Sequence, residues 1–248
     1  MRLLLILILA LPVATAQTYT TANELFTAIT STPEPASSYM ELRMAITTSA
    51  GLVLERNLAT WAQGTTHRLI TFTAPADIAG AGFLSVTDDD GTEHRSIYLP
   101  ALQRVRNIAG GQETEAFFGS DFSYADMAGF DPTEYTLTLD QVINNAVYVV
   151  TAVPLNPGTY THLVLHIPEE ALIPTRVEYY AGVDLKKVLT VPAYRKAGPF
   201  TVPTERRMET IVAGEVYSYT QIWQEHVELN PELPANVFTE EFLRGTHE

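Results

Sequence analysis

The chain has 248 residues and no cysteine, so it can hold no disulfide framework, zinc finger, iron–sulfur cluster or thiol nucleophile. It is also poor in basic residues: 15 Lys and Arg stand against 29 Asp and Glu, a formal net charge of −14. Nucleic-acid binding needs a basic surface that displaces counterions from phosphates, so we expect no nucleic-acid partner. The 46% hydrophobic content argues against a disordered chain and predicts a globular protein.

Long hydrophobic runs are absent after the N-terminus. There, Arg2 precedes an apolar run over residues 3–11, and Ala14-Thr15-Ala16 has the small-x-small pattern of a cleavage site. This pattern predicts a secretory signal peptide over residues 1–16, cleaved after Ala16, rather than a retained anchor helix. We therefore expect an exported, soluble protein in which residues 17–248 form a single domain.

Alternating hydrophobicity dominates the rest of the chain. Met40, Leu42, Met44 and Ile46 recur with a period of two, which is typical of a strand with one apolar face. Similar segments, separated by glycine and proline turns, recur up to residue 227. Together they predict a mainly β protein of about ten or eleven antiparallel strands, in one large curved sheet or barrel.

Capping patterns predict a few short helices. Thr21 and Glu24 have capping-box spacing, and the apolar residues after Thr21 follow one helical face. Ser123 and Asp126 repeat the same spacing before a shorter helical turn. Thr239 is the expected N-cap of a last helix near the C-terminus.

Two clusters could hold a metal ion, and for both we favour the simpler interpretation. The run of three aspartates before Gly91 resembles the start of a calcium loop, but the required bidentate glutamate is missing, and an Asp-Gly hairpin explains the run. His162 and His166 share one strand face with Val164, which indicates an exposed surface. We expect no metal and no cofactor.

Catalytic motifs are equally scarce. Gly119-Ser120-Asp121 is not the G-x-S-x-G elbow that presents a nucleophilic serine, and no histidine lies in a recognisable motif. A pair of acids brought together by the fold stays open, as in a glycosidase. We predict that the protein is not an enzyme and name no catalytic residue.

The apolar strand faces predict instead a function in binding an apolar ligand. So long a sheet has more apolar face than a few short helices can cover, so it must close, dimerise or hold an apolar ligand. Methionine suits a variable acyl chain because its thioether is flexible. The candidate cavity residues on these strands are Leu42, Met44, Phe72, Phe83 and Trp223.

Two segments carry a resemblance to a known family. Residues 97–106 (IYLPALQRVR) and 117–127 (FFGSDFSYADM) closely resemble the signature of the LolA-like outer-membrane lipoprotein-sorting proteins. Residues 75–84 and 237–243 are weaker matches. The resemblance implies a half-open barrel of the LolA/LolB type around an apolar cavity, with short helices as a lid. It also implies a periplasmic carrier of lipid or acylated lipoprotein, with an inner-membrane transporter and an outer-membrane acceptor as partners.

The resemblance adds further site residues by position. Tyr98, Phe117, Phe118, Phe122 and Tyr124 are candidates for the mouth of the cavity. Arg104 and Arg106 are head-group candidates, although they could instead pair with Glu113 and Glu115. The sequence departs from the family pattern at residues 94–97 (HRSI), where relatives often carry a tryptophan.

The leading hypothesis is therefore a carrier that binds lipoprotein acyl chains or a free lipid in a barrel cavity. Two alternatives remain open at this point. One is an interaction module of an inner-membrane transporter that carries no cargo. The other is an exported hydrolase of an unfamiliar type.

Overall fold

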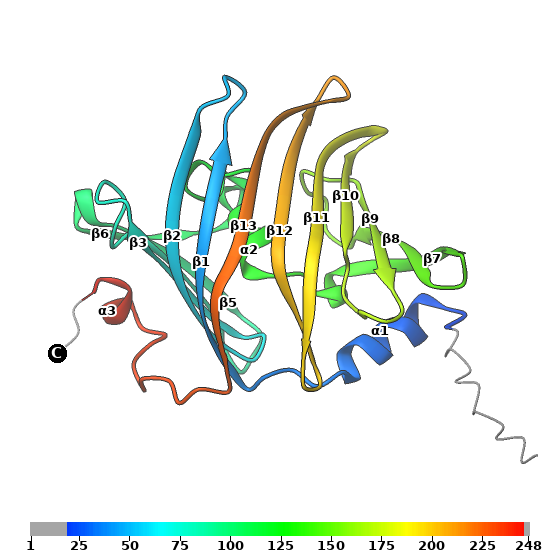
Figure 1. Ribbon diagram of the computed structural model, residues 1–248, viewed down its shortest axis with the longest axis horizontal. Coiled ribbons are helices and arrows are strands. Elements are labelled where there is room, and N and C mark those ends of the chain that lie inside the picture. Colours follow the sequence, from blue (N-terminus) through cyan, green and yellow to red (C-terminus); the bar gives the residue numbers. More distant parts are fainter. Residues whose placement is uncertain (1–18, 246–248) are drawn as a thin grey trace, which may run out of the picture.

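A computed structural model describes residues 19–245, so the predicted signal peptide lies outside the described residues. Thirteen antiparallel strands form one strongly curved sheet, in the order β6-β5-β4-β3-β2-β1-β13-β12-β11-β10-β9-β8-β7 (Figure 1). The strands are β1 (Ser37–Thr47), β2 (Val53–Gln63), β3 (His67–Ala74), β4 (Gly82–Thr87), β5 (Glu93–Leu99), β6 (Arg104–Ile108), β7 (Tyr135–Ile143), β8 (Val147–Pro154), β9 (His162–Pro168), β10 (Arg176–Ala181), β11 (Asp184–Ala197), β12 (Phe200–Val212) and β13 (Glu215–Leu229).

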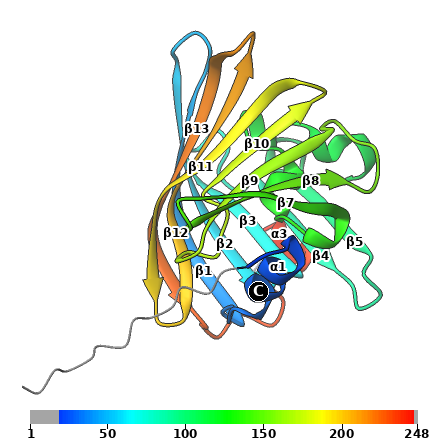
Figure 2. The ribbon, with the colours of Figure 1, turned by 90° about the vertical axis from the view of Figure 1, so that its right-hand side faces the viewer.

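The predicted class, a mainly β half-open barrel, is confirmed. In the described part of the chain the two edge strands, β6 and β7, each pair on one side only, so the sheet curls without closing (Figure 2). The predicted count of ten or eleven strands is too low. The short strand β6 (RVRNI) is largely exposed and lacks an alternating apolar pattern, so its pairing with β5 left no sequence signal.

The strand order forces one segment across the hollow of the sheet. The first and last strands, β1 and β13, pair in the middle, and the chain reaches the edges only at β6 and β7. Residues 109–134 must therefore cross the concave face from one edge to the other (Figure 1). This crossing segment contains the 117–127 block and the elements η2 (Gly110–Thr114), η3 (Phe117–Gly119), α2 (Tyr124–Ala128) and η4 (Pro132–Glu134).

Local capping signals are confirmed at all three α-helices. Thr21 and Glu24 form both bonds of the capping box at α1 (Ala22–Ser31), and Ser123 and Asp126 do so at α2. Thr239 accepts a hydrogen bond from the Phe242 backbone at α3 (Glu240–Leu243). One further 3₁₀ turn, η1 (Pro100–Leu102), joins β5 to β6.

The helices cover opposite faces of the sheet. Leu25 and Phe26 of α1 join the main hydrophobic core on the concave side, whereas Leu243 of α3 packs with Leu69 and Leu84 on the convex side. A Cβ on Gly82 of β4 would lie 2.7 Å from Leu243 Cδ1, so α3 rests directly on a glycine. No helix within residues 19–245 is long and apolar enough to cross a membrane.

Candidate functional site

A cavity of about 610 Å³ lies on the concave face, between the sheet and the crossing segment. Its volume falls in the range of small-molecule binding sites. The apolar part of its wall is formed by alternate residues of the central and later strands and by the crossing segment: Met40, Leu42, Ile70, Phe122, Met127, Phe130, Leu163, Leu165, Val177, Leu189, Val191 and Ile222.

Strand periodicity explains this wall. In β9 the residues that point inward, Leu163 and Leu165, are buried, and the alternate His162, Val164 and His166 are partly exposed. The two histidines thus share the outer face with Val164, as the sequence predicts. The pairing of Leu165 with Val150 and Val177 continues the inner row across the sheet.

A buried aspartate anchors the crossing segment to the sheet. The Asp121 carboxylate, in a residue only 6% exposed, accepts hydrogen bonds from Thr210 Oγ1 at 2.6 Å and Thr220 Oγ1 at 2.7 Å, and from Ser218 Oγ. Lys187 Nζ donates to the Asp121 carbonyl oxygen at 2.6 Å. Strands β11, β12 and β13 therefore all bind one residue of the 117–127 block.

The next turn of the crossing segment is fixed in the same way. Lys187 Nζ lies 3.7 Å from Asp126 Oδ2, and Arg68 Nη1 of β3 donates to the Met127 carbonyl oxygen at 2.9 Å. The α2 helix is thereby bound from both sides of the hollow.

Charged groups gather at one end of the cavity. Arg95 pairs with Glu93 at 2.5 Å and with Glu113 at 2.9 Å. Nearby, burial raises the pKa of the Glu134 carboxyl, and the negative charge of Asp131 raises it further. Within residues 19–245 no three His, Cys, Asp or Glu side chains are placed to hold a metal ion. The Asp-Gly hairpin is confirmed: it joins β4 to β5, and Gly91 has φ +86°.

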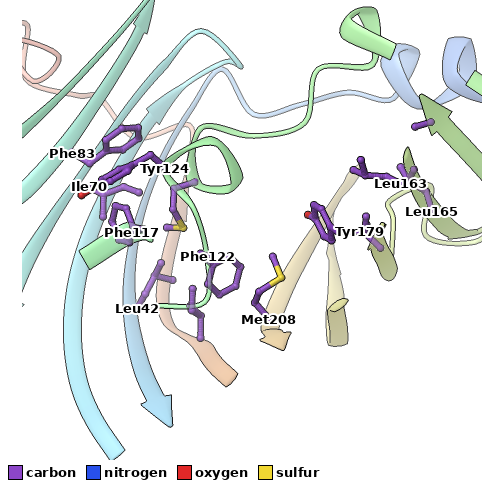
Figure 3. Packing of buried hydrophobic residues seen from close by; sticks show 14 of the residues in the cluster. Leu42, Ile70, Phe83, Phe117, Phe122, Tyr124, Leu163, Leu165, Tyr179 and Met208 are labelled. Atoms are coloured by element: carbon purple, nitrogen blue, oxygen red, sulfur yellow. The ribbon is translucent and has the colours of Figure 1, made fainter. Parts of the chain in front are cut away.

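Two of the ten predicted cavity residues, Leu42 and Phe122, line the cavity. Six others fill the concave face beside it instead. Phe72, Phe83, Phe117 and Tyr124 are buried and pack ring against ring, with centroids 5.6–6.0 Å apart, and the partly buried Phe118 joins them. Figure 3 shows Phe83, Phe117 and Tyr124 of this group side by side. Met44 is buried in the same core.

The remaining candidates lie away from the concave face. Tyr98 packs in the cluster under α3, on the convex side. Trp223 alternates with the inward-facing Ile222, and the Arg43 guanidinium covers its ring at 3.8 Å. The head-group candidates Arg104 and Arg106 lie on the edge strand β6, and Arg106 pairs with Glu115 at 3.7 Å. A ligand-binding role for any of these residues stays a prediction.

Sequence reasoning missed the three arginines in the cavity wall: Arg95, which pairs with Glu93 and Glu113, and Arg68 and Arg206. A signal was available, because Arg68 has the same strand parity as Ile70 and Phe72, and Arg206 the same parity as Met208. A cation at an apolar, inward-facing position is unusual and points to a function.

The fold matches known structures over nearly its full length. A DUF1329 family protein from Desulfovibrio piger ATCC 29098 is 25% identical with a TM-score of 0.80, covering 89% of this chain and 96% of that one. A putative outer membrane lipoprotein-sorting protein domain from Vibrio parahaemolyticus is 22% identical with a TM-score of 0.80, covering 89% and 97%. A LolA superfamily protein from Nitrosomonas europaea is 16% identical with a TM-score of 0.70, covering 90% and 100%.

These neighbours confirm the resemblance at the level of the fold: the chain shares its fold with proteins described as a putative outer membrane lipoprotein-sorting protein domain and a LolA superfamily protein. A family model described as "uncharacterized protein" matches residues 64–245, and the chain belongs to this family. No curated protein matches the sequence.

Proposed function

We propose that this protein is a non-enzymatic carrier that binds a lipid, or the acyl chains of a lipoprotein, in the cavity of the concave face. The observation that carries the proposal is the cavity itself. It has about 610 Å³ of space in the hollow of a curved sheet, and most of its wall consists of aliphatic and aromatic side chains.

The driving force would be the removal of hydrocarbon from water. Each buried methylene contributes about 0.8 kcal/mol, so ten methylenes contribute about 8 kcal/mol before the cost of ordering the chain. An open sheet suits such a ligand, because the chain can enter at an edge without unfolding the core. The flexible side chains of Met40 and Met127 in the wall can adapt to chains of different shape.

The cellular setting is part of the same proposal. The predicted signal peptide over residues 1–16 would direct the domain over residues 17–248 to the periplasm. Neighbours with the same fold are described as lipoprotein-sorting and LolA superfamily proteins, which supports this setting. An inner-membrane donor and an outer-membrane acceptor are the partners that such a carrier needs.

A cavity-filling variant tests the proposal. Leu189 lines the cavity and is partly exposed to it, so Leu189→Trp should occupy the space that the ligand needs. Thr190→Trp is the matched control, because Thr190 is also partly exposed and lies next in β11 on the other face. Protein purified without detergent is extracted and its lipids are identified by mass spectrometry.

We expect the native protein and Thr190→Trp to release lipid in near-stoichiometric amounts, and Leu189→Trp to release several-fold less. A native protein that releases no lipid and takes up no fluorescent fatty acid would refute the carrier proposal. Hydrolysis of ester or glycoside substrates would favour the hydrolase alternative instead.

A further inference from the structure

Of the three arginines in the cavity wall, Arg95 is paired with two glutamates, and the other two, Arg68 and Arg206, come from distant strands. Arg68 lies on β3 and Arg206 on β12, and three strands separate β3 from β12 in the sheet. Four strand spacings of about 4.8 Å amount to roughly 19 Å along the sheet. The curvature of the sheet nevertheless brings both side chains to the wall of one cavity.

Neither guanidinium has a carboxylate partner. Within residues 19–245, no ion pair involves Arg68 or Arg206. Arg68 donates one hydrogen bond to a backbone carbonyl, and Arg206 forms none with the described residues. Burial and, as the smaller cause, the positive charge of Arg68 together lower the pKa of Arg206 to about 10.

The acidic groups of the cavity wall form no ion pair with these two arginines. Glu93 and Glu113 are paired with Arg95, and Asp126 is paired with Lys187. Asp131 and Glu134 also line the cavity, and within residues 19–245 neither forms an ion pair with Arg68 or Arg206. Burial lowers the pKa of Arg68, and in the described part of the chain Glu34 is the one acidic side chain that raises it, by less than burial lowers it. No acidic side chain of that part raises the pKa of Arg206. Two like charges thus line one cavity, and neither forms an ion pair within the described residues, an arrangement that is costly unless an anion joins it.

We propose that Arg68 and Arg206 together bind the anionic head group of the carried lipid, a phosphate or a carboxylate, while its acyl chains lie along the apolar wall. This inference rests on the proposed carrier function and adds the chemical class of the ligand. Guanidinium groups suit both anions, because each can donate two parallel hydrogen bonds. Because the protein's net charge of −14 repels anions, an anionic ligand needs such a local cationic pair to bind.

The test compares three probes by isothermal titration calorimetry on delipidated full-length protein: dodecyl phosphate below its micelle concentration, dodecanol and inorganic phosphate. Dodecyl phosphate should bind about tenfold or more tightly than dodecanol, as charge-assisted hydrogen bonds allow. Inorganic phosphate should bind far more weakly than dodecyl phosphate.

Arg206→Gln should remove most of this preference and leave the affinity for dodecanol unchanged. Arg206→Lys, which keeps the charge but loses the paired donors, should retain part of it. Arg207→Gln is the matched control: Arg207 is next on the same strand, pairs with Glu209 at 2.8 Å and stacks over Tyr219 at 3.7 Å. This control should keep the full preference. Arg68→Gln also removes the hydrogen bond to α2, so Arg206 gives the cleaner result.

The outcomes separate the two proposals. Equal binding of dodecyl phosphate and dodecanol by the native protein would overturn the head-group site and leave the carrier function intact. Binding of neither alkyl probe would overturn both. Inorganic phosphate that binds as tightly as dodecyl phosphate would show a site for a free anion and overturn the assignment to a lipid. A preference that survives in Arg206→Gln would overturn the role of this residue.

Discussion

The concave face has two halves with the same kind of apolar lining: one half is filled by side chains, and the other contains open space. Over β2 to β6, the crossing segment fills the hollow with its own rings, led by Phe117 and Tyr124 against Phe72 and Phe83. On the side of β9 to β12, the same segment leaves about 610 Å³ open, and this cavity extends to Leu42 of β1 and to Arg68 and Ile70 of β3. Figure 3 shows Phe83, Phe117 and Tyr124 grouped on one side, and Met208, Tyr179 and Leu163 on the other.

The comparison shows what the 117–127 block does structurally. Its aromatic residues fill one half, and its aspartates, Asp121 and Asp126, bind the strands of the other half. The block therefore sets the boundary between core and cavity, and of its four aromatic residues only Phe122 lines the cavity. The four predictions below test this division, from the largest expected effect to the smallest.

Removal of a ring from the filled half should have the largest effect. Phe117 is fully buried against four rings, so Phe117→Ala should lower the free energy of unfolding by about 3–5 kcal/mol. Urea denaturation followed by circular dichroism measures this loss. Phe130→Ala is the control, because Phe130 is exposed and borders the cavity, and it should cost far less. Similar losses for both variants would contradict the division.

Removal of Asp121, which anchors the crossing segment, should have the second-largest effect. Asp121→Ala deprives three hydroxyl groups and the segment of their common acceptor, so we expect a loss of about 2–4 kcal/mol. Asp140→Ala removes an exposed carboxylate that also accepts a hydroxyl hydrogen bond, from Thr151, and should cost less than about 1 kcal/mol. Hydrogen exchange should show faster opening of residues 117–128 in Asp121→Ala alone. Protection equal to that of the native protein would show that another contact holds the segment.

Two leucines of equal burial sharpen the comparison. Leu58 and Leu165 are both 1% exposed, but only Leu165 lines the cavity of the concave face, whereas Leu58 belongs to the main core and borders a separate hollow over β1 and β2. Leu58→Ala should cost about 3–4 kcal/mol, and Leu165→Ala about 1–2 kcal/mol less, because a side chain beside empty space has fewer atoms in contact. Denaturation in the absence of lipid measures both. With lipid bound, the difference between the two variants in their loss of unfolding free energy should become smaller. A larger cost for Leu165→Ala would mean that the hollow half is as tightly packed as the filled one.

Alkaline pH should weaken the folded state gradually. Burial raises the pKa of the Tyr179 phenol well above its usual value near 10, and the charge of Asp126 raises it further. Between pH 10 and this raised pKa, the unfolded state has lost the proton that the folded state keeps, so stability falls as pH rises. We expect a loss of about 1 kcal/mol per pH unit above 10 from this group.

Tyr179→Phe should flatten this pH dependence, whereas the exposed Tyr217→Phe should leave it unchanged. The measurement is the midpoint of urea unfolding between pH 8 and 11. The lowered pKa of Arg206 acts in the opposite direction, because its burial cost disappears as the guanidinium loses its proton above pH 10. Identical slopes for the two tyrosine variants would show that Tyr179 titrates normally.

Much of the architecture could be predicted from short-range patterns. The alternation that starts at Met40 gives β1, the Asp-Gly turn gives the β4–β5 hairpin, and the capping box at Ser123 gives α2, because each depends on neighbours a few residues apart. The residues of the candidate site were harder to predict from the sequence. Tyr98 and Trp223 have the same aromatic character as Phe122, but they lie on the convex face.

The sequence by itself determined the class of fold, since a long series of alternating strands with few helices leaves one large antiparallel sheet as the outcome. The tertiary structure decided which part of that sheet is core and which is cavity. This depends on register, on bulges that shift the facing residues, as between Glu41 and Leu42, and on the path of the crossing segment. Those features arise from contacts as distant as Asp121 with Thr220, and no local pattern along the chain encodes them.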